Sequence, residues 1–437
     1  MKTNFLLIIV FLLQGYFLDA QNLTAKLSKT EKKQIIDSTA FLLRKSYIFE
    51  DKANEMADLI TGNLGSGKYD AIDDPAGFGE TLTEDLRSVN HDKHLAVAYA
   101  PDRVRQMKAA QQDTSALSFD GREERMSNYG FEEVKILSGN VGYLKLNSFS
   151  EAQEGLAVAV AAMNFLANTD ALIIDLTQNG GGSPQMIQLI SSYLFDQNIR
   201  HLNSFYNREA GQTTQTWTLP YVPGKKLTDK SIYILTSSYT FSAAEEFTYN
   251  LKNMERATIV GETTGGGAHP LFFRPLNDNF MIGLPYMRAI NPITNTNWEG
   301  TGIEPDLACA AQGAFDLAYL TALKKLRDAE KDETYRNIFN WSVDGLKSKL
   351  EPVTLSVNEM KAFTGTYGSR VITLENGSLC YQREGRPKFI MEPMGRDAFS
   401  LTGLDNFRLR FIREADKVVA LEGYYSNGQT SRNEKTK

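Results

Sequence analysis

Residues 232–247 read IYILTSSYTFSAAEEF. The first four form an apolar run of the kind found in strands that are buried on both faces. Polar residues interrupt the run, and Ser242 then stands at a turn with the small residues Ala243 and Ala244 behind it. The stretch predicts a buried strand, a turn, and a helix that runs from Ser242 to about Met254.

Similar units lie on both sides of this stretch. Apolar strands are predicted at 141–146, 171–176 and 258–261, and helices at 151–166, 185–195 and 313–330. Strand–loop–helix units in series indicate an α/β layered core. We place this core at residues 111–335.

Different patterns flank the core. Residues 21–110 carry apolar side chains at helical spacing, which predicts a helical N-terminal domain followed by a short strand near 95–99. Residues 353–437 contain short alternating strands separated by Gly or Asn turns, and Asn376-Gly377 is a strong hairpin signal. We therefore expect a separate all-β domain at the C-terminal end.

The first twenty residues form a segment of their own. Lys2 precedes an apolar run at 5–13 that is too short to span a bilayer, and a polar break is followed by Leu-Asp-Ala, which ends at Ala20. This layout is typical of a cleavable signal peptide, so we expect export to the periplasm or the extracellular space. No later segment is long and apolar enough to predict a membrane span in the mature chain.

Composition excludes several classes of function. The net charge of -6 is spread along the chain without a basic patch, which argues against nucleic acid as a partner. Cys309 and Cys380 are too few for a disulfide framework and are expected to be isolated thiols. With four His and no CxxC, the sequence predicts no metal site.

Ser242 is the first candidate for chemistry. At the start of a helix its hydroxyl would face free backbone N–H groups and the positive end of the helix dipole, which favour an alkoxide and an oxyanion. The same pattern also fits an ordinary helix cap, with Glu245 completing a capping box. The local pattern leaves both interpretations open.

The stretch 175–182, DLTQNGGG, is the second candidate. Glycines after a buried strand let a backbone approach a ligand closely. The N–H of Gly181 or Gly182 would supply one oxyanion donor, with the N–H of Ala243 as the other. The alternatives are a tight strand-to-helix turn and a phosphate loop, but the Gly-Lys-Ser/Thr ending of the latter is missing.

A nucleophilic Ser needs a base, and His is the usual one. The four candidates are His91, His94, His201 and His269. A Gly-rich stretch at 298–306, WEGTGIEPD, offers the carboxylates Glu299 and Glu304, although it also fits an ordinary turn.

Together these segments resemble the carboxy-terminal processing, or tail-specific, serine peptidases. Four landmarks occur in the family's order: Asp-Lys-His at 92–94, the Gly-rich stretch at 175–182, Ser-Ala-Ala-Glu from Ser242 followed by 256–262, and Gly-Ile-Glu-Pro-Asp at 302–306. The resemblance covers roughly residues 30–310 and is nearest to the branch of interphotoreceptor retinoid-binding protein and the tricorn core protease. It implies a crotonase-like α/β core.

The sequence departs from the commoner branch at one position. Tail-specific proteases pair the Ser with a Lys 25 residues later, and here position 267 is Gly. The tricorn-like branch instead uses a His before the core and a Glu after the nucleophile. By motif, His94 matches the base and Glu299 the supporting acid, with His269 as the rival base. Between Tyr99 and the core there is no room for the PDZ domain of many relatives.

The resemblance implies an exported peptidase that cleaves peptides or unfolded proteins by acyl transfer, without metal or organic cofactor. Two alternatives use the same fold: a non-catalytic binding protein for apolar ligands or peptides, and a serine esterase. A third is a surface interaction protein that acts through the β domain.

Overall fold

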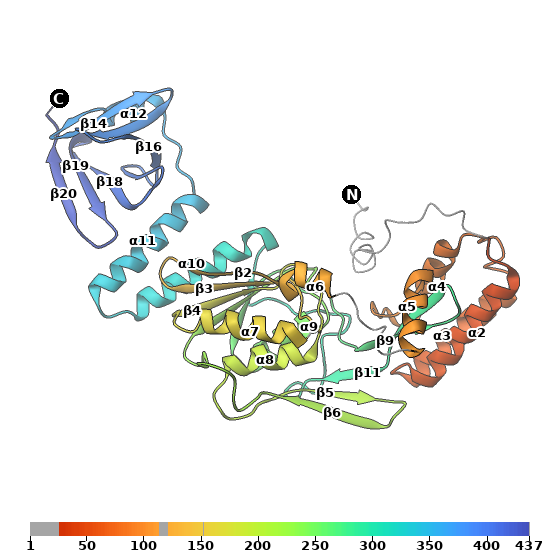
Figure 1. Ribbon diagram of the computed structural model, residues 1–437. Coiled ribbons are helices and arrows are strands. Elements are labelled where there is room, and N and C mark those ends of the chain that lie inside the picture. The colour runs from red at the N-terminus through yellow and green to blue at the C-terminus, as the bar shows by residue number, and fades with distance from the viewer. Residues whose placement is uncertain (1–25, 113–120, 152, 437) are drawn as a thin grey trace. The chain divides into compact units, whose positions relative to one another are not determined.

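The computed structural model describes residues 26–112, 121–151 and 153–436 of the chain (Figure 1). The predicted signal peptide, residues 1–20, lies outside the described residues. The chain divides into two compact units, Met1–Lys135 with Gly142–Ala314 and Ile136–Val141 with Phe315–Lys437. The first unit contains all the candidate residues named above.

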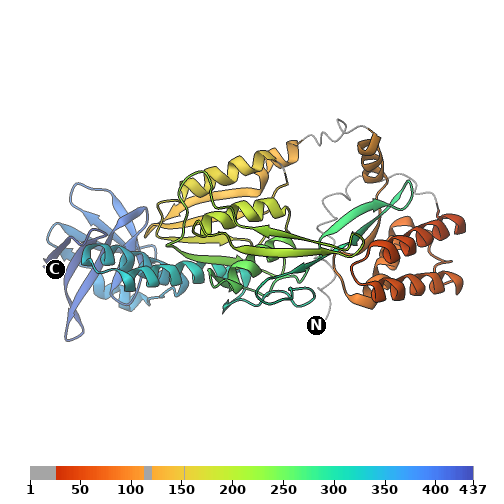
Figure 2. The same ribbon diagram turned by 90° about the horizontal axis from the view of Figure 1, so that it is seen from below.

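The first unit begins with three helices, as the sequence pattern predicts. They are α2 (Lys29–Ser46), α3 (Glu50–Gly65) and α4 (Pro75–Asn90), and α2 and α3 lie side by side (Figure 2). Asp74 caps α4 by accepting the N–H of Gly77, and the helix ends where His91 adopts a left-handed conformation with φ 53°. After His91 the chain continues into a short loop that carries Asp92 and His94.

The loop leads into a small antiparallel sheet. Strand β1 (Ala96–Tyr99) pairs with β10 (Phe280–Pro285), and β10 pairs with β9 (Leu271–Pro275). The apolar residues of this sheet share a core with helices α2 to α4. The pairing therefore brings the end of α4 next to the segment that precedes β9, although the two segments are far apart in the sequence. Helix α5 (Pro101–Gln112) follows β1.

The centre of the first unit is a six-stranded sheet in the order β12-β8-β7-β4-β3-β2. The neighbours β4, β7, β8 and β12 are parallel. The bounds are β2 (Phe131–Leu137), β3 (Val141–Leu146), β4 (Ala171–Asp175), β7 (Ser231–Thr236), β8 (Ala257–Gly261) and β12 (Leu307–Ala308). The predicted α/β core is thus confirmed.

Three helices share a hydrophobic core with this sheet: α7 (Gln153–Phe165), α8 (Pro184–Leu194) and α9 (Ala243–Asn253) (Figure 1). Because parallel strands end at the same edge of a sheet, the loops after β4, β7 and β8 meet there. These loops carry the glycines of 180–182, Ser242 and residues 262–270. The topology therefore gathers the sequence candidates at one edge.

Some elements of the first unit carry no clear sequence pattern. Strands β5 (His201–Asn207), β6 (Gln212–Trp217) and β11 (Met287–Ile290) form a sheet in the order β11-β5-β6. Strand β6 is mostly exposed on both faces and reads QTTQTW, so it has no apolar alternation to detect. A short helix, α6 (Arg122–Met126), and the turn η2 (Asn128–Gly130) precede β2.

The second unit holds the predicted all-β region, most of helix α10 (Ala311–Ala329), and the helices α11 (Glu333–Leu350) and α12 (Val357–Phe363). Its antiparallel sheet runs in chain order, and a bridge between Tyr367 and Lys435 joins the first strand to the chain beyond the last. The strands are β13 (Gly365–Tyr367), β14 (Arg370–Glu375), β15 (Ser378–Arg383), β16 (Lys388–Pro393), β17 (Ala398–Leu401), β18 (Leu404–Glu414), β19 (Lys417–Tyr425) and β20 (Thr430–Glu434).

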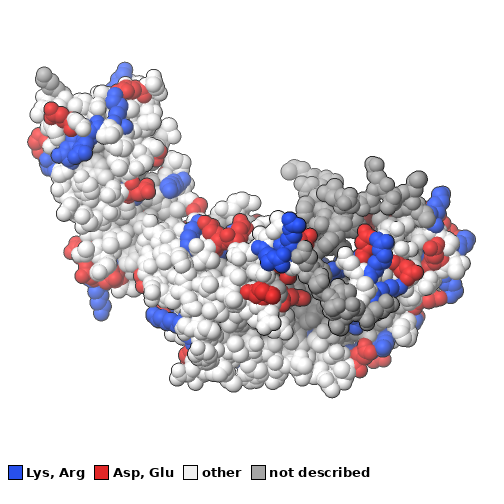
Figure 3. Space-filling model, in the orientation of Figure 1, with Lys and Arg blue, Asp and Glu red and all other residues white. Residues whose placement is uncertain are grey.

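The predicted hairpin turn at Asn376-Gly377 joins β14 to β15, and both turn residues have positive φ. Cys309 and Cys380 are free thiols. Within the described ranges, no helix combines the length and apolar character that crossing a membrane requires. On the face shown in Figure 3, acidic and basic side chains are interspersed.

Candidate active site

Ser242 lies where strand β7 passes into helix α9. Its backbone has φ 54° and ψ -119°, a combination that non-glycine residues rarely adopt and that is typical of functional turns. Its N–H donates to Oε2 of Glu245 at 2.9 Å. The strained turn is therefore held by a specific contact from the first turn of the helix.

Glu245 does more than cap the helix. Its buried carboxylate accepts four hydrogen bonds: Oε1 from the Thr264 hydroxyl (2.5 Å) and the Gly266 N–H (2.7 Å), and Oε2 from the N–H groups of Gly267 (2.8 Å) and Ser242 (2.9 Å). Burial raises the pKa of Glu245 to about 7, although these bonds favour the ionised form. The side chain ties the turn at Ser242 to the loop after β8. The sequence pattern revealed only its capping role.

Ser242 and His94 line the same cavity, which has a volume of about 310 Å³. Most of its surface is apolar. The apolar side chains around it are Ala96, Ala98, Phe241, Leu271, Phe273 and Met281. The structure thus brings together a hydroxyl from the parallel sheet edge and an imidazole from the loop after α4.

His94 is held by its own loop. Its backbone N–H donates to Oδ1 of Asp92 at 3.0 Å, and its ring packs against Phe241 with 4.8 Å between the ring centroids. Burial lowers the pKa of His94 to about 4, so its imidazole is neutral near pH 7. A neutral imidazole is the form that a general base requires. Within the described part of the chain, its buried Nδ1 has no hydrogen-bond partner.

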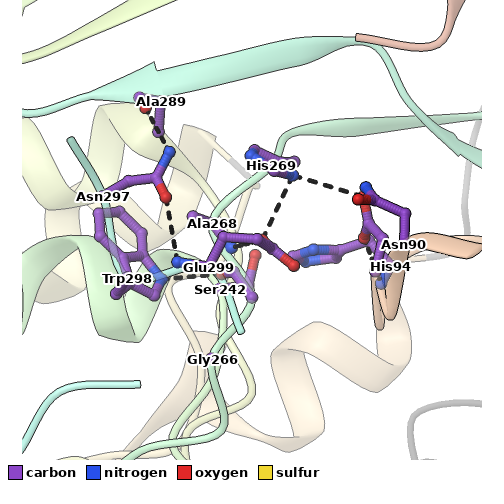
Figure 4. Close-up of polar contacts among 12 residues, drawn as sticks. Asn90, His94, Ser242, Gly266, Ala268, His269, Ala289, Asn297, Trp298 and Glu299 are labelled. Atoms are coloured by element: carbon purple, nitrogen blue, oxygen red, sulfur yellow. Dashed lines mark hydrogen bonds and ion pairs between the residues drawn. The ribbon is translucent and has the colours of Figure 1, made fainter. Parts of the chain in front are cut away.

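Glu299 lies beside His94. A ring nitrogen of His94 and one carboxylate oxygen each of Asp92 and Glu299 lie within 4.8 Å of one another. Oε2 of Glu299 accepts the N–H of Ala268 at 2.6 Å, whereas its buried Oε1 has no partner among the described residues. Burial, together with the nearby charge of Asp92, raises the pKa of Glu299 to about 7. Figure 4 shows Glu299, His94 and Ser242 grouped together.

His269, the rival base, lies between two carboxylates. Its Nδ1 is 3.4 Å from Oδ2 of Asp92 and 3.3 Å from Oε2 of Glu299 (Figure 4). The side chain is 2% exposed, packs edge-on against Phe49, and is not among the residues that line the cavity. It therefore reaches the carboxylates rather than the cavity that Ser242 lines.

Asp92 is a site residue whose role the sequence did not reveal. It is fully buried, and it accepts hydrogen bonds from the Tyr47 hydroxyl (3.0 Å) and the backbone N–H of His94. The nearby His269 and His94 hold the pKa of Asp92 below its usual range despite burial. Its position two residues before His94 was the only signal available in the sequence.

The three glycines at 180–182 have different surroundings. The N–H of Gly181 donates to Oδ1 of Asn179 at 2.8 Å, so it is already engaged. A Cβ on Gly182 would lie 1.9 Å from the Phe149 carbonyl oxygen, which places this residue against a neighbouring backbone. Gly180 is the glycine of this run that lines the cavity with Ser242. Ala243 directly follows Ser242 as the first residue of α9.

The other sequence candidates are not among the residues that line the cavity. His91 is exposed at the end of α4, and Glu304 is exposed in its loop. His201 lies on β5 and stacks on Trp217 with 4.4 Å between the ring centroids.

Comparison with known families agrees with this geometry. Residues 140–309 match the model of peptidase family S41, and residues 20–127 match the N-terminal domain of peptidase S41 in eukaryotic IRBP. The chain belongs to peptidase family S41. In this S41 chain the first matched segment carries Ser242 and Glu299, and the second carries His94.

Individual relatives of the S41 chain are distant. The probable CtpA-like serine protease of Staphylococcus epidermidis (strain RP62A) is 24% identical over 319 residues, which cover 69% of this chain and 61% of the relative. Similar solved structures include a putative peptidase from Parabacteroides merdae (19% identity, 69% of this chain, 98% of that chain, TM-score 0.47). The tricorn protease is another (15% identity, 68% and 37%, TM-score 0.46).

In the S41 chain, Gly267, the position compared above with the Lys of tail-specific proteases, has no space for a side chain. A Cβ at position 267 would lie 2.1 Å from the ring of Phe241 and 2.8 Å from Cε1 of His94. These distances are far below van der Waals contact, so no side chain fits without rearrangement. The imidazole of His94 and the ring of Phe241 occupy the space that a Lys would need.

Proposed function

We propose that this chain is an exported serine peptidase that cleaves peptide bonds through an acyl-enzyme on Ser242. The observation that carries the proposal is the shared cavity of Ser242 and the neutral His94, with Glu299 beside the imidazole. The predicted signal peptide supports export. The apolar lining favours substrates with an apolar side chain next to the scissile bond.

The first half of the reaction forms the acyl-enzyme. His94 accepts the proton of the Ser242 hydroxyl as Oγ attacks the peptide carbonyl carbon. The tetrahedral oxyanion is held by backbone N–H groups, which we assign to Ala243 and to Gly180 rather than to Gly181 or Gly182. As the C–N bond breaks, the leaving amine takes the proton from His94.

The second half regenerates the enzyme. A water molecule enters the cavity, His94 takes one of its protons, and the resulting hydroxide attacks the acyl carbon. The C–O bond to Ser242 then breaks, and Oγ recovers the proton from His94. The product leaves with a free carboxylate. No cofactor takes part in this scheme.

Two carboxylates support the imidazole in this proposal. Asp92 fixes the loop through the backbone N–H of His94, and Glu299 lies close enough to stabilise the charged ring electrostatically. A water between the unpartnered Nδ1 of His94 and Oε1 of Glu299 would satisfy both atoms and connect the two side chains. His269 in turn contacts both carboxylates and so acts as a positioning residue.

A fluorophosphonate probe tests the proposal because it reacts covalently with an activated Ser. The wild type should be labelled and should cleave an unstructured peptide, whereas Ser242→Ala and His94→Ala should do neither. Ser238→Ala removes another hydroxyl from the same cavity and should retain the label. A Ser242→Ala protein that cleaves the peptide at the parental rate would refute the assignment.

Two further outcomes separate the alternatives. Binding of apolar ligands without any labelling of the wild type would identify a carrier. Labelling together with hydrolysis of esters but not of peptides would identify an esterase.

A further inference from the structure

We propose that Asp92, His94 and Glu299 form a binding site for one transition-metal ion such as Zn²⁺, and that the bound ion inhibits the enzyme reversibly. The metal-binding part stands on the geometry of the three side chains alone. The inhibition rests on the proposed function, because it requires His94 to be the base.

The spacing of the three ligand atoms suits a single ion. A ring nitrogen of His94 and one oxygen from each carboxylate lie within 4.8 Å of one another. Three atoms spaced by 4.8 Å lie about 2.8 Å from the centre of their triangle, so inward movements of less than about 1 Å would give the metal–ligand distances of about 2.0–2.2 Å that Zn²⁺ requires.

Two of these side chains have unused coordination capacity. Within the described residues, Nδ1 of His94 and Oε1 of Glu299 are both buried and have no hydrogen-bond partner. Buried polar atoms are nearly always paired, so these two atoms require a shared partner, which we take to be a water in the metal-free enzyme and the ion in the metal-bound enzyme. A metal ion would satisfy both atoms at once.

The surrounding residues hold the carboxylates as metal-binding carboxylates are usually held. Oδ2 of Asp92 accepts the Tyr47 hydroxyl, and Oε2 of Glu299 accepts the Ala268 N–H. His269 contacts these same two oxygens. Oε1 of Glu299 remains available to the ion.

The charge balance and the donor types also favour a transition metal. Two cationic groups lie near the site, but Arg87 donates to the carbonyls of Leu95 and Lys93, and the Lys93 ammonium donates to the carbonyl of Gly265. Within the described part of the chain, neither carboxylate therefore has a hydrogen bond or an ion pair with a Lys or Arg side chain. An imidazole nitrogen with two carboxylate oxygens suits Zn²⁺, whereas Mg²⁺ prefers oxygen donors and retained water.

Occupation of this site would block the reaction. When one imidazole nitrogen binds a metal, the single proton of the neutral ring is on the other nitrogen, so neither nitrogen can accept a proton and His94 can no longer serve Ser242. His94 lines the cavity, which gives the ion a route in and a chelator a route to remove it.

The test measures binding separately from activity. The Ser242→Ala protein, freed of metal with EDTA and dialysed, is titrated with ZnCl₂ in a calorimeter, with MgCl₂ as the comparison ion. We expect one equivalent of Zn²⁺ and no heat from Mg²⁺. Adding Glu299→Gln or Asp92→Asn should weaken Zn²⁺ binding by at least about tenfold.

Matched controls locate the site. Glu304→Gln makes the same change on an exposed residue of the same loop, and His91→Asn removes an exposed imidazole near His94 while keeping a residue that tolerates positive φ. Both should bind Zn²⁺ as the parent does. Circular dichroism of each variant confirms that it is folded.

Activity provides the second readout. In the wild type, Zn²⁺ should suppress fluorophosphonate labelling, and EDTA should restore it. Absence of Zn²⁺ binding to Ser242→Ala, or equal binding by folded Glu299→Gln and Asp92→Asn proteins, would overturn the metal site. Zn²⁺ binding with no labelling of the metal-free wild type would instead refute the proposed function and leave the site standing.

Discussion

Glu246 should make the first unit less stable as the pH rises, and Glu246→Gln should remove this effect. The side chain is 5% exposed, in the first turn of α9. Burial raises the pKa of Glu246 to about 7 from its ordinary value of 4.5, and the amides of Asn203 and Asn250 offset this only in part. The folded protein therefore keeps a proton that the unfolded chain has lost.

The magnitude follows from the two pKa values. Below pH 4.5 Glu246 is protonated in both states and has no effect. Between pH 4.5 and 7 the folded state binds more protons than the unfolded chain, so the free energy of unfolding falls as the pH rises, by about 3 kcal/mol in total. A Gln cannot ionise, so the variant should gain this amount over the wild type between pH 4.5 and 8.

Urea denaturation at several pH values would measure the difference. Trp298 is buried in the same unit, so its fluorescence reports on this unit when Trp217 and Trp341 are replaced by Phe. Glu255→Gln, at an exposed position just after α9, is the matched control and should follow the wild type. If the free energies of unfolding of the variant and the wild type differ by the same amount at pH 5 and at pH 8, the reasoning is refuted.

Three further predictions concern the site. Glu245→Ala removes the acceptor that orders Ser242 and the loop at Gly267, so the labelling rate should fall by about 100-fold, and an unchanged rate would contradict the positioning role. Gly267→Ala should slow labelling because its Cβ meets the ring of Phe241, and adding Phe241→Ala should recover part of the rate; no recovery would argue against the clash. In buffer with a chelator, kcat/KM should fall in two steps as the pH is lowered, first as Glu299 takes up a proton near its raised pKa of about 7 and then as His94 does near its lowered pKa of about 4. Glu299→Gln should show only the second step, and a decline of that variant centred at the ordinary His value of about 6.5 would show that the ring is more solvated than the structure indicates.

The elements that the sequence predicted well share one property: their pattern is local. Strands β4 and β7 are short apolar runs, and α9 follows a turn with small residues, so each is recognisable from a few neighbours. Strands β5 and β6 were not predicted. Strand β6 is mostly exposed on both faces and forms a strand through its pairing with β5, so its own residues show no apolar alternation. Helix α11 was likewise absent from the prediction.

The residues of the candidate site likewise divide into those with a local sequence signal and those without one. Ser242 could be singled out because a hydroxyl at the start of a helix is a local feature, and Glu245 because it completes a capping box. Three of the four hydrogen bonds that Glu245 accepts come from the loop after β8, and no residue near Glu245 in the sequence predicts them. For the same reason the glycine that faces the cavity, Gly180, could not be distinguished from its two neighbours.

By itself, the sequence determined the buried strands, the turn at Ser242 and the set of imidazoles and carboxylates available to it, because these depend on residue type and short-range spacing. Only the tertiary structure decided which imidazole lines the cavity with Ser242. Strand β1 pairs with β10, and the ends of the parallel strands meet at one edge of the sheet, so that His94 lines the cavity with Ser242. His269 instead lies between Asp92 and Glu299. That choice depends on packing between segments far apart in the chain, which no local pattern records.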